Sequence, residues 1–242
     1  MTQPSARTVA ALLTGLIRDP GRPRLTWYGR AGERIELSGA VLDNWVSKTT
    51  NLLVEEFDAG PGTRVRLDLP PHWRTLVWAL AAWRVGATVL PTDEPADIVV
   101  TDRPEEHAGA DQLVAVSLPG LSLRWTGPAL PPGAIDAAQA VMTYSDAIGW
   151  SPEPVPSTAA LGAVRHADLL ATATGSVPEL AVGARVLLIT DQVASHTDFL
   201  LTALGVLARD GSVVLTTDGR TPSELDRIVA GERIGVRLSP PA

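Results

Sequence analysis

Residues 64–90 read RVRLDLPPHWRTLVWALAAWRVGATVL, and residues 185–215 read RVLLITDQVASHTDFLLTALGVLARDGSVVL. Both stretches contain a short apolar strand, a long apolar helix, a glycine and a second apolar strand. The pair Thr-Asp follows the second strand in each, ending at Asp93 and at Asp218. Strands that alternate with helices indicate βαβ units with right-handed crossovers and a largely parallel sheet. The sequence therefore predicts a fold in which one unit occurs twice.

A further strand is expected after each copy of this unit, at 97–101 and at 234–238. The strands are nearly continuous apolar runs, which are typical of sheets covered on both faces. We therefore expect an α/β fold with α/β/α layers and largely parallel sheets, built from two similar βαβ halves. The halves are expected at 1–116 and 166–242, joined by a Pro-rich connecting region at 117–165, and we expect them to pack as one globular unit.

Local signals place the other elements. Ser38 is expected to cap a second helix, and Thr221 with Glu224 predicts a capping box at the start of the last helix. The tryptophans Trp45, Trp73, Trp78 and Trp83 lie on predicted helices at spacings typical of a core. Further expected elements are a helix at 6–18, a β-hairpin from 25–28 and 34–37, and a short helix near 135–142.

The composition argues against several classes of protein. The formal net charge is −7, and phosphate neutralisation needs clustered Lys and Arg, so we expect no nucleic-acid and no membrane partner. The chain has no cysteine, which excludes disulfides and thiolate chemistry. No basic-then-apolar signal follows Met1, and no apolar run reaches ~18 residues. We therefore expect a soluble cytoplasmic protein.

Common catalytic and cofactor motifs are missing from the sequence. There is no Walker-type phosphate loop, no Gly-x-Gly-x-x-Gly, no nucleophile elbow and no His-Glu-x-x-His. Lys48 is the only lysine, and it lies on the predicted second helix. We therefore expect no bound cofactor and no metal.

Two histidines have polar neighbours. His166 precedes Asp168, and His196 lies between Ser195 and Asp198. Such groups are compatible with a metal or acid/base site. The alternative is that they are ordinary surface or helix-start residues, because residues two apart on a helix do not face each other.

Three aspartates follow predicted strands directly. Asp93, Asp191 and Asp218 would lie at the carboxyl edge of a sheet, where ligands bind in open α/β folds. The alternative is that aspartate suits turns and helix starts, and Asp191 is the strongest of the three candidates. For His72, at the start of a helix after two prolines, packing or capping is favoured over catalysis.

Five short motifs follow one another along the chain: LTWY, GPGTRV, LPPHW, AAWRVGATVLP and RHADLLA. His196 also lies 15 residues before Gly211. This order resembles the N-terminal part of the adenylate-forming (AMP-binding) enzymes, such as acyl-CoA synthetases, over nearly the whole chain. The motifs begin at Leu25, Gly60, Leu69, Ala81 and Arg165.

Departures from this family concern its catalytic parts. The resemblance implies a Ser/Thr/Gly-rich loop ending in Pro-Lys, whose N–H groups and cation hold the ATP phosphates. Here the corresponding residues 156–164 include one glycine and no lysine. The family's adenine-binding segment, Mg²⁺-binding Glu, ribose-binding Asp and C-terminal domain with its catalytic Lys have no counterpart, and Lys48 cannot replace that lysine. The ending 239–242 indicates a natural chain end, as in short bacterial proteins distantly similar to these enzymes.

We therefore expect a pseudoenzyme: a non-catalytic adenylate-forming-like domain that binds a small acyl or aryl ligand or a partner protein. A homodimer is compatible with this expectation. One alternative is an enzyme of different chemistry in the residual cleft, with Asp191 and His196 as its polar groups and His166 as a further candidate. Another is a binder of ATP, AMP or CoA without turnover, or half of a split adenylate-forming enzyme. If the protein is active, the family implies an adenylate-forming ligase.

Overall fold

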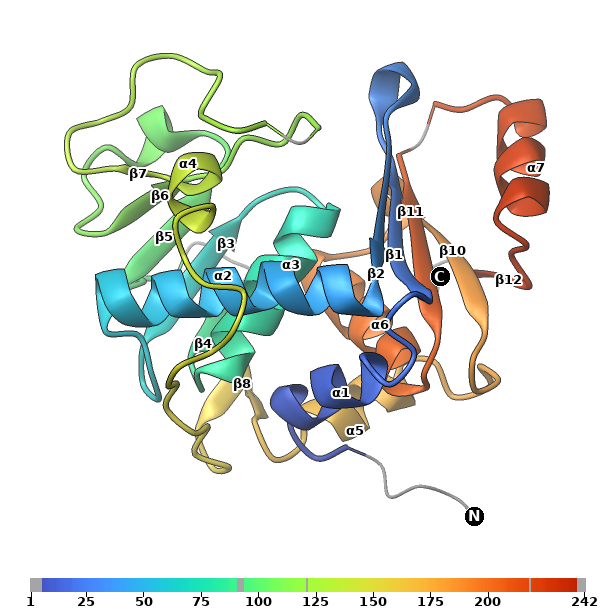
Figure 1. The fold of residues 1–242 in the computed structure, drawn as a ribbon, viewed down its shortest axis with the longest axis horizontal. Helices are drawn as coiled ribbons and strands as arrows, with labels where there is room; N and C mark the ends of the chain where they lie inside the picture. The colour runs from blue at the N-terminus through green and yellow to red at the C-terminus, as the bar shows by residue number, and fades with distance from the viewer. Residues whose placement is uncertain (1–5, 91–93, 121, 218, 239–242) are drawn as a thin grey trace. The chain divides into compact units, whose positions relative to one another are not determined.

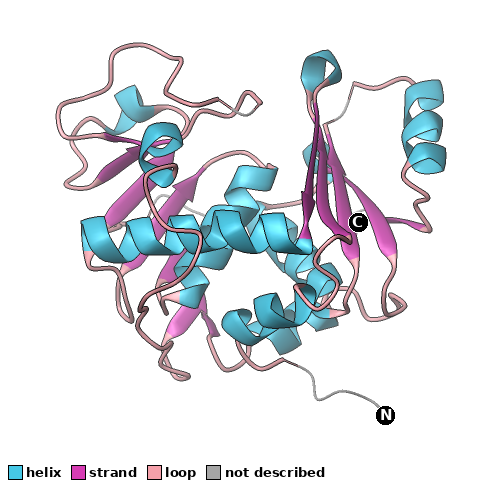
Figure 2. Cartoon of the chain, viewed as in Figure 1, coloured by secondary structure: helices cyan, strands magenta, loops and turns pink. Residues whose placement is uncertain are grey.

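The computed structural model describes residues 6–90, 94–120, 122–217 and 219–238 (Figure 1). Each of the two β-sheets has helices beside it (Figure 2). The expected strand-end aspartates Asp93 and Asp218, and the expected chain end at 239–242, lie outside the described residues. None of the helices within the described ranges is both long enough and apolar enough to cross a membrane.

The chain forms two compact units that interleave along the sequence. The first unit consists of Met1–Leu42, Pro71–Trp73 and Leu170–Ala242, and the second of Asp43–Pro70 and Arg74–Leu169. The predicted boundaries of the sequential halves, at 116 and 166, stay a prediction.

The sheet of the first unit has the strand order β12-β10-β11-β1-β2. All neighbours are parallel except β1 and β2, which form the expected hairpin. Its strands are β1 (Pro23–Tyr28), β2 (Arg34–Ser38), β10 (Arg185–Ile189), β11 (Ser212–Thr216) and β12 (Val236–Leu238). Its helices are α1 (Val9–Leu16), α5 (Leu169–Gly175), α6 (His196–Ala208) and α7 (Pro222–Gly231), with 3-10 turns η1 (Arg30–Gly32) and η3 (Thr190–Gln192).

Helices cover both faces of this sheet. Leu187 of β10 and Val214 of β11 form a buried cluster with Ile228 of α7. Successive side chains of a strand point to opposite faces, so the buried Val213 and Leu215 face the other side, where α6 contacts β11. Figure 1 shows α7 and α6 on opposite sides of these strands. The expected α/β/α layering is confirmed for this unit.

The sheet of the second unit has the strand order β7-β6-β5-β3-β4-β8-β9. Only β8 and β9 are antiparallel. Its strands are β3 (Arg64–Asp68), β4 (Thr88–Leu90), β5 (Ile98–Thr101), β6 (Leu113–Ala115), β7 (Ile135–Asp136), β8 (Ala159–Leu161) and β9 (Val164–Arg165). Its helices are α2 (Gly39–Phe57), α3 (Trp73–Arg84) and α4 (Ala137–Val141), with the 3-10 turn η2 (Pro104–His107). By sequence, α2 and α3 begin in the first unit.

The doubled strand–helix–strand unit is confirmed, and the two copies share one topology. The first copy gives the strand order β5-β3-β4, and the second gives β12-β10-β11. Each helix ends in a residue with positive φ: Gly86 (+84°) after α3 and Asp210 (+58°) after α6. In both copies the third strand lies beside the first strand, on the side opposite to the second strand.

The Pro-rich region 117–165 contains more regular structure than the sequence predicts. The expected short helix is present as α4, but β7, β8 and β9 also lie in this region and extend the second sheet at both ends. These strands are two or three residues long, too short to show an apolar period. The interpretation as a linking region with one helix was therefore incomplete.

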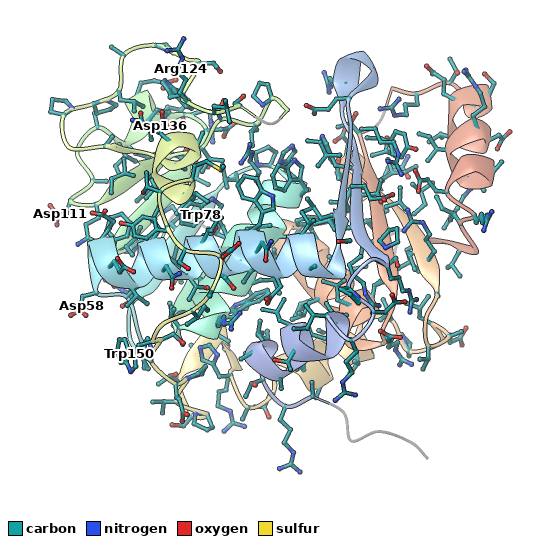
Figure 3. All side chains as sticks on the ribbon, viewed as in Figure 1. Asp58, Trp78, Asp111, Arg124, Asp136 and Trp150 are labelled. Carbon is teal, nitrogen blue, oxygen red and sulfur yellow. The ribbon has the colours of Figure 1, made fainter. Side chains whose placement is uncertain are left out.

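The expected caps and core are confirmed. The Ser38 hydroxyl accepts a hydrogen bond from the Val41 N–H at 3.3 Å, and Thr221 with Glu224 forms the capping box of α7. Figure 3 shows Trp78 within the side chains packed between the elements of the second unit, and Trp150 at its edge. Their exposed fractions are 3% and 67%. Trp73 and Trp83 are fully buried, and Trp45 is half-buried beside the Arg74 guanidinium.

Candidate functional site

A tight β-hairpin occupies the part of the sequence in which the family resemblance implies a phosphate-binding loop. Leu161 of β8 pairs with Val89 of β4, and β8 turns back into β9 through Gly162 and Ala163 alone. Gly162 has φ +53°, which a two-residue hairpin turn requires.

Two side chains of the same unit hold this hairpin in place. The indole Nε1 of Trp83 donates to the Ala160 carbonyl at 2.9 Å, and the Thr88 hydroxyl donates to the Ala159 carbonyl at 2.8 Å. Ala160 and Leu161 are buried. A segment that pairs as a strand cannot curl its N–H groups around an anion as a phosphate loop does.

His166 follows the hairpin and is buried, with 8% of its surface exposed. Burial lowers the pKa of its imidazole, and hydrogen bonds with the backbone of Gly86 and Ala87 offset only part of this effect. Its Nε2 is buried without a hydrogen-bond partner. Asp168 pairs with Arg165 at 2.7 Å. His166 is therefore placed as a neutral packing residue beside the hairpin.

Asp191 and His196 belong to the first unit, whereas His166 belongs to the second, so the three candidates form no cluster within one unit. Asp191 lies in η3 after β10, is exposed, and accepts a hydrogen bond from the Thr190 hydroxyl at 3.0 Å. His196 is the first residue of α6, and its ring centroid lies 6.3 Å from that of Phe199.

The neighbours of His196 act as a helix cap. The Ser195 hydroxyl accepts from the Asp198 N–H at 3.1 Å and donates to the Asp198 carboxylate at 2.6 Å. His72 is buried, and its ring lies 4.4 Å from the ring of Trp27 in an edge-on arrangement. The packing role expected for His72 is therefore confirmed.

A cluster that the sequence did not predict lies at the carboxyl edge of the second sheet. Asp68 and Thr101, the last residues of β3 and β5, are paired in register. The Thr101 hydroxyl donates to Oδ2 of Asp68 at 2.8 Å, and Nε2 of His107 lies 2.8 Å from the same oxygen. Nη2 of Arg103 donates to the other oxygen, Oδ1, at 2.8 Å.

Glu106 completes this cluster from the turn η2. Its Oε2 lies 3.0 Å from Nη1 of Arg103. One ligand atom from each of Asp68, Glu106 and His107 lies within 4.8 Å of the others, a separation from which a metal ion could be held. We refer to Asp68, Thr101, Arg103, Glu106 and His107 as the β3 edge cluster.

The β3 edge cluster lies where ligands usually bind in open α/β sheets. The chain leaves β3 for β4 on one side, and β5 lies on the other side, so the strand order reverses at β3. Ligand crevices form outside the carboxyl ends of strands at such a switch point. A signal was present in the sequence, because Asp68 ends a predicted strand and the doubled unit implies that β5 returns beside it.

The pKa values of two aspartates at this edge, Asp68 and Asp102, are shifted in opposite directions. Burial alone would raise the pKa of Asp68, but hydrogen bonds from His107 and Thr101 and the charge of Arg103 outweigh it and lower the pKa. Burial raises the pKa of Asp102, and repulsion from Asp68 and Glu105 adds to this rise. Several carboxylates therefore lie close enough to one another at this edge to repel each other.

The carboxyl edge of the first sheet is covered by a side chain. Nη2 of Arg220 donates to the carbonyls of Tyr28 and Gly29 at 3.1 and 2.6 Å, and its Nε donates to the Thr216 hydroxyl at 2.6 Å. Arg220 thereby occupies the hydrogen-bonding groups at the ends of β1 and β11.

Solved structures share this fold. An acyl-CoA synthetase from Brucella canis is 20% identical with a TM-score of 0.72, over 95% of this chain and 46% of that chain. A fatty acyl CoA synthetase of Mycobacterium tuberculosis is 13% identical with a TM-score of 0.63, over 96% and 49%. The N-terminal domain of FACL13 of the same organism is 13% identical with a TM-score of 0.66, over 96% and 62%. The expected fold is confirmed, and the chain spans about half the length of these two synthetases.

A sequence relative matches this chain over nearly its whole length. No family model matches the chain. A TIGR03089 family protein of Mycobacterium tuberculosis is 34% identical over 244 residues, which cover 97% of this chain and 98% of that protein. The similarity is continuous over almost the whole of both chains. This chain therefore belongs to the TIGR03089 family.

Proposed function

We propose that this protein is an adenylate-forming-like domain that does not form adenylates, and that it binds a small ligand or a partner protein. The β8–β9 hairpin carries this proposal. Adenylation needs a loop that neutralises a polyphosphate with N–H groups and a cation. Residues 156–164 have no lysine, and their strand residues are paired with β4 and β9.

The single lysine supports the same conclusion because it has a structural partner. Nζ of Lys48, on α2, donates to the Tyr144 carbonyl at 2.6 Å. One turn away, the Asn51 side chain donates to the carbonyls of Ser145 and Ala147 at 2.9 and 3.0 Å. Lys48 and Asn51 thus hold the segment 144–147 on α2. A lysine in this position is engaged with the backbone of its own unit.

An ATP–pyrophosphate exchange assay with a panel of aliphatic and aryl carboxylic acids tests the proposal. We expect no exchange above the blank, while an active acyl-CoA synthetase serves as the positive control. Acid-dependent exchange by the purified chain would overturn the proposal. A Lys48→Gln variant would then show whether the exchange depends on the single lysine.

A second candidate is supported by length: the chain spans 46% and 49% of the two acyl-CoA synthetases. It is one half of a split adenylate-forming enzyme, with ATP, AMP or CoA bound at full strength only in the complex. Affinity purification from the native organism, followed by the exchange assay on the eluate, distinguishes the two. A lysine-bearing partner that confers exchange favours the split enzyme, and an inactive eluate counts against it.

Nucleotide binding without turnover is separable by thermal shift. A ligand that binds only the folded state adds ~2.7 kcal/mol of stability at 100 times its Kd. A flat screen with ATP, AMP and CoA therefore counts against this alternative.

The proposal also includes a cytoplasmic location and no nucleic-acid partner, consistent with the net charge of −7. It further includes a homodimer as one state of the protein, which size-exclusion chromatography would detect.

A further inference from the structure

The β3 edge cluster brings together donor atoms of the types that bind zinc. The segment 101–107 reads TDRPEEH and turns sharply in η2, with the buried Pro104 at its start. This turn carries Glu106 and His107 back to Asp68, which lies 38 and 39 positions earlier in the chain. Imidazole nitrogen and carboxylate oxygen are both zinc ligands.

We propose that Asp68, Glu106 and His107 bind a Zn²⁺ ion at the carboxyl edge of the second sheet. Zinc with three protein ligands keeps a fourth position for water. Zinc–ligand distances of about 2.0–2.2 Å place the ligand atoms about 3.5 Å apart in a tetrahedron. Nε2 of His107 and Oδ2 of Asp68 are 2.8 Å apart, and the three ligand atoms lie within 4.8 Å. Small side-chain rotations therefore suffice to close the site.

Neighbouring side chains position the ligands. Arg103 holds Oδ1 of Asp68 and Oε2 of Glu106, which leaves Oδ2 and Oε1 for the ion. The Thr101 hydroxyl donates to Oδ2 and orients that oxygen. Carboxylate ligands of metals are usually hydrogen-bonded in this way by a second layer of residues. Arg103 is half exposed, so its side chain can move aside as the ion enters.

The negative charge of this edge favours the binding of a cation in addition to the Arg103 guanidinium. Asp102 and Glu105 add their carboxylates to those of Asp68 and Glu106, so within the described residues four carboxylates lie around Arg103 and His107. Repulsion among like charges is relieved when a divalent ion binds. An ion-pair network without an ion is the competing explanation, and it predicts no zinc affinity.

Calorimetric titration of the chelator-treated full chain with ZnCl₂ tests the site. We expect one Zn²⁺ per chain, with Glu106→Gln and His107→Gln each weakening binding by at least ~10-fold. Glu105→Gln is the matched control, since it removes the same charge from the same turn, and it should leave the affinity within about twofold. Co²⁺ in place of Zn²⁺ should give visible absorption that His107→Gln changes.

Two results would overturn the site. One is the absence of zinc binding to the folded native chain at millimolar ZnCl₂. The other is zinc binding that the ligand variants weaken no more than Glu105→Gln does, which would show adventitious binding to surface carboxylates. Circular dichroism of each metal-free variant confirms that it is folded, and Glu106 is exposed enough for its substitution to leave the fold intact. The readout contains no nucleotide, so it is independent of the proposed function.

Discussion

Each unit has an ionic network built around one carboxylate, but the two networks differ in burial. The Glu232 side chain, in the first unit, is 6% exposed, and that of Asp68, in the second, is 21% exposed. Glu232 lies between two arginines, Arg34 and Arg185. Asp68 instead has further carboxylates beside it and one arginine. Burial with matched charge makes a structural crosslink, whereas partial exposure with surplus negative charge leaves a site that can take a cation.

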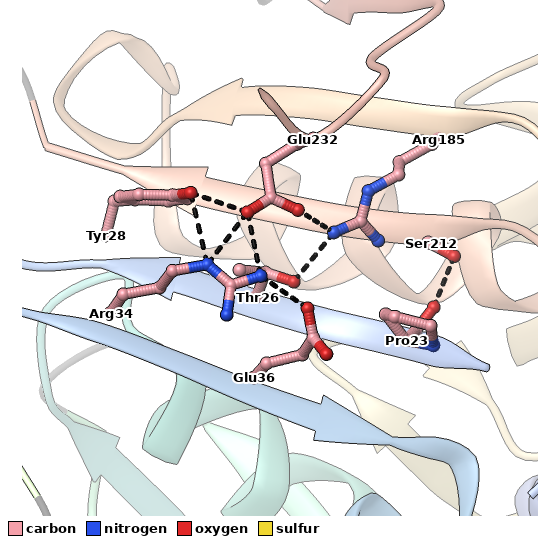
Figure 4. A network of polar contacts seen from close by, with 8 residues as sticks. All are labelled: Pro23, Thr26, Tyr28, Arg34, Glu36, Arg185, Ser212 and Glu232. Carbon is pink, nitrogen blue, oxygen red and sulfur yellow. Dashed lines mark hydrogen bonds and ion pairs between the residues drawn. The ribbon is translucent and has the colours of Figure 1, made fainter. Parts of the chain in front are cut away.

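The network of the first unit connects its strands to the end of α7 (Figure 4). Glu232 follows α7 and accepts hydrogen bonds from the Tyr28 hydroxyl, from Arg34 and from Arg185. Arg185 also donates to the Thr26 hydroxyl at 3.0 Å. These contacts join β1, β2 and β10 to α7. Loss of the carboxylate would therefore leave two guanidinium groups without their shared partner.

The largest expected effect is a difference between the two networks. Glu232→Gln should lower the free energy of unfolding by about 3 kcal/mol, because removing one partner of a buried pair leaves the other charge unpaired. Asp68→Asn should cost about 1 kcal/mol or less, since exposed pairs are weak. Urea unfolding of both variants measures the difference. Equal losses would show that burial does not distinguish the two networks.

The turns that end α3 and α6 give a smaller contrast. Gly86 has φ +84°, and a Cβ there would lie 2.9 Å from the Pro154 Cα. Gly86→Ala should therefore cost about 2 kcal/mol, since a left-handed conformation is unfavourable for residues with a Cβ. At the corresponding position Asp210 has φ +58° and pairs with Arg22 and Arg24.

Asp210→Gly should change stability by less than about 1 kcal/mol, because relief of the strained φ offsets the lost pairs of a half-exposed carboxylate. The buried Arg24 keeps its hydrogen bonds to the carbonyls of residue 210 and Leu16. Thermal unfolding of the two variants side by side is the measurement. If Asp210→Gly cost as much as Gly86→Ala, the ion pairs with the buried Arg24 would outweigh the backbone strain.

The fold could be predicted because its signals are local. The doubled unit appears as apolar strands, an apolar helix and a glycine in fixed order, and Thr221 with Glu224 forms the capping box that their spacing predicts. The β3 edge cluster has no local signal of this kind, since only the strand-end position of Asp68 and the doubled unit point to it. Asp68 and His107 meet only because β5 lies beside β3, which is a long-range property of the sheet.

The position of a histidine in the sequence also does not reveal its environment. His166 and His107 both follow short strands, yet His166 is buried beside the β8–β9 hairpin and His107 contacts Asp68. The hairpin itself was hidden, since strands of two or three residues show no period. The sequence shows that residues 156–164 lack the glycines and the lysine of a phosphate loop. It does not show that β8 pairs with β4.

The smallest expected effects concern the pH dependence of stability, and one titrating group in each unit is expected to contribute to it. Burial lowers the pKa of His166 below its ordinary value of 6.5. The folded protein then binds fewer protons than the unfolded chain, so stability falls as the pH drops below 6.5. For Glu232 burial would raise the pKa, but hydrogen bonds from Tyr28, Arg185 and Arg34 lower it below the ordinary value of 4.5.

The stability that Glu232 contributes is therefore fully present above pH 4.5 and is lost as the pH falls through the lowered pKa. Urea unfolding between neutral and acid pH should show a loss that begins near 6.5 from His166 in the second unit, and a further loss below 4.5 to which Glu232 in the first unit contributes. His166→Gln should flatten the upper part of this profile only, and Glu232→Gln the lower part only. A native profile that stays level from pH 7 to 5 would contradict the assignment of His166 as a neutral packing residue, because its proton uptake on unfolding would then be absent.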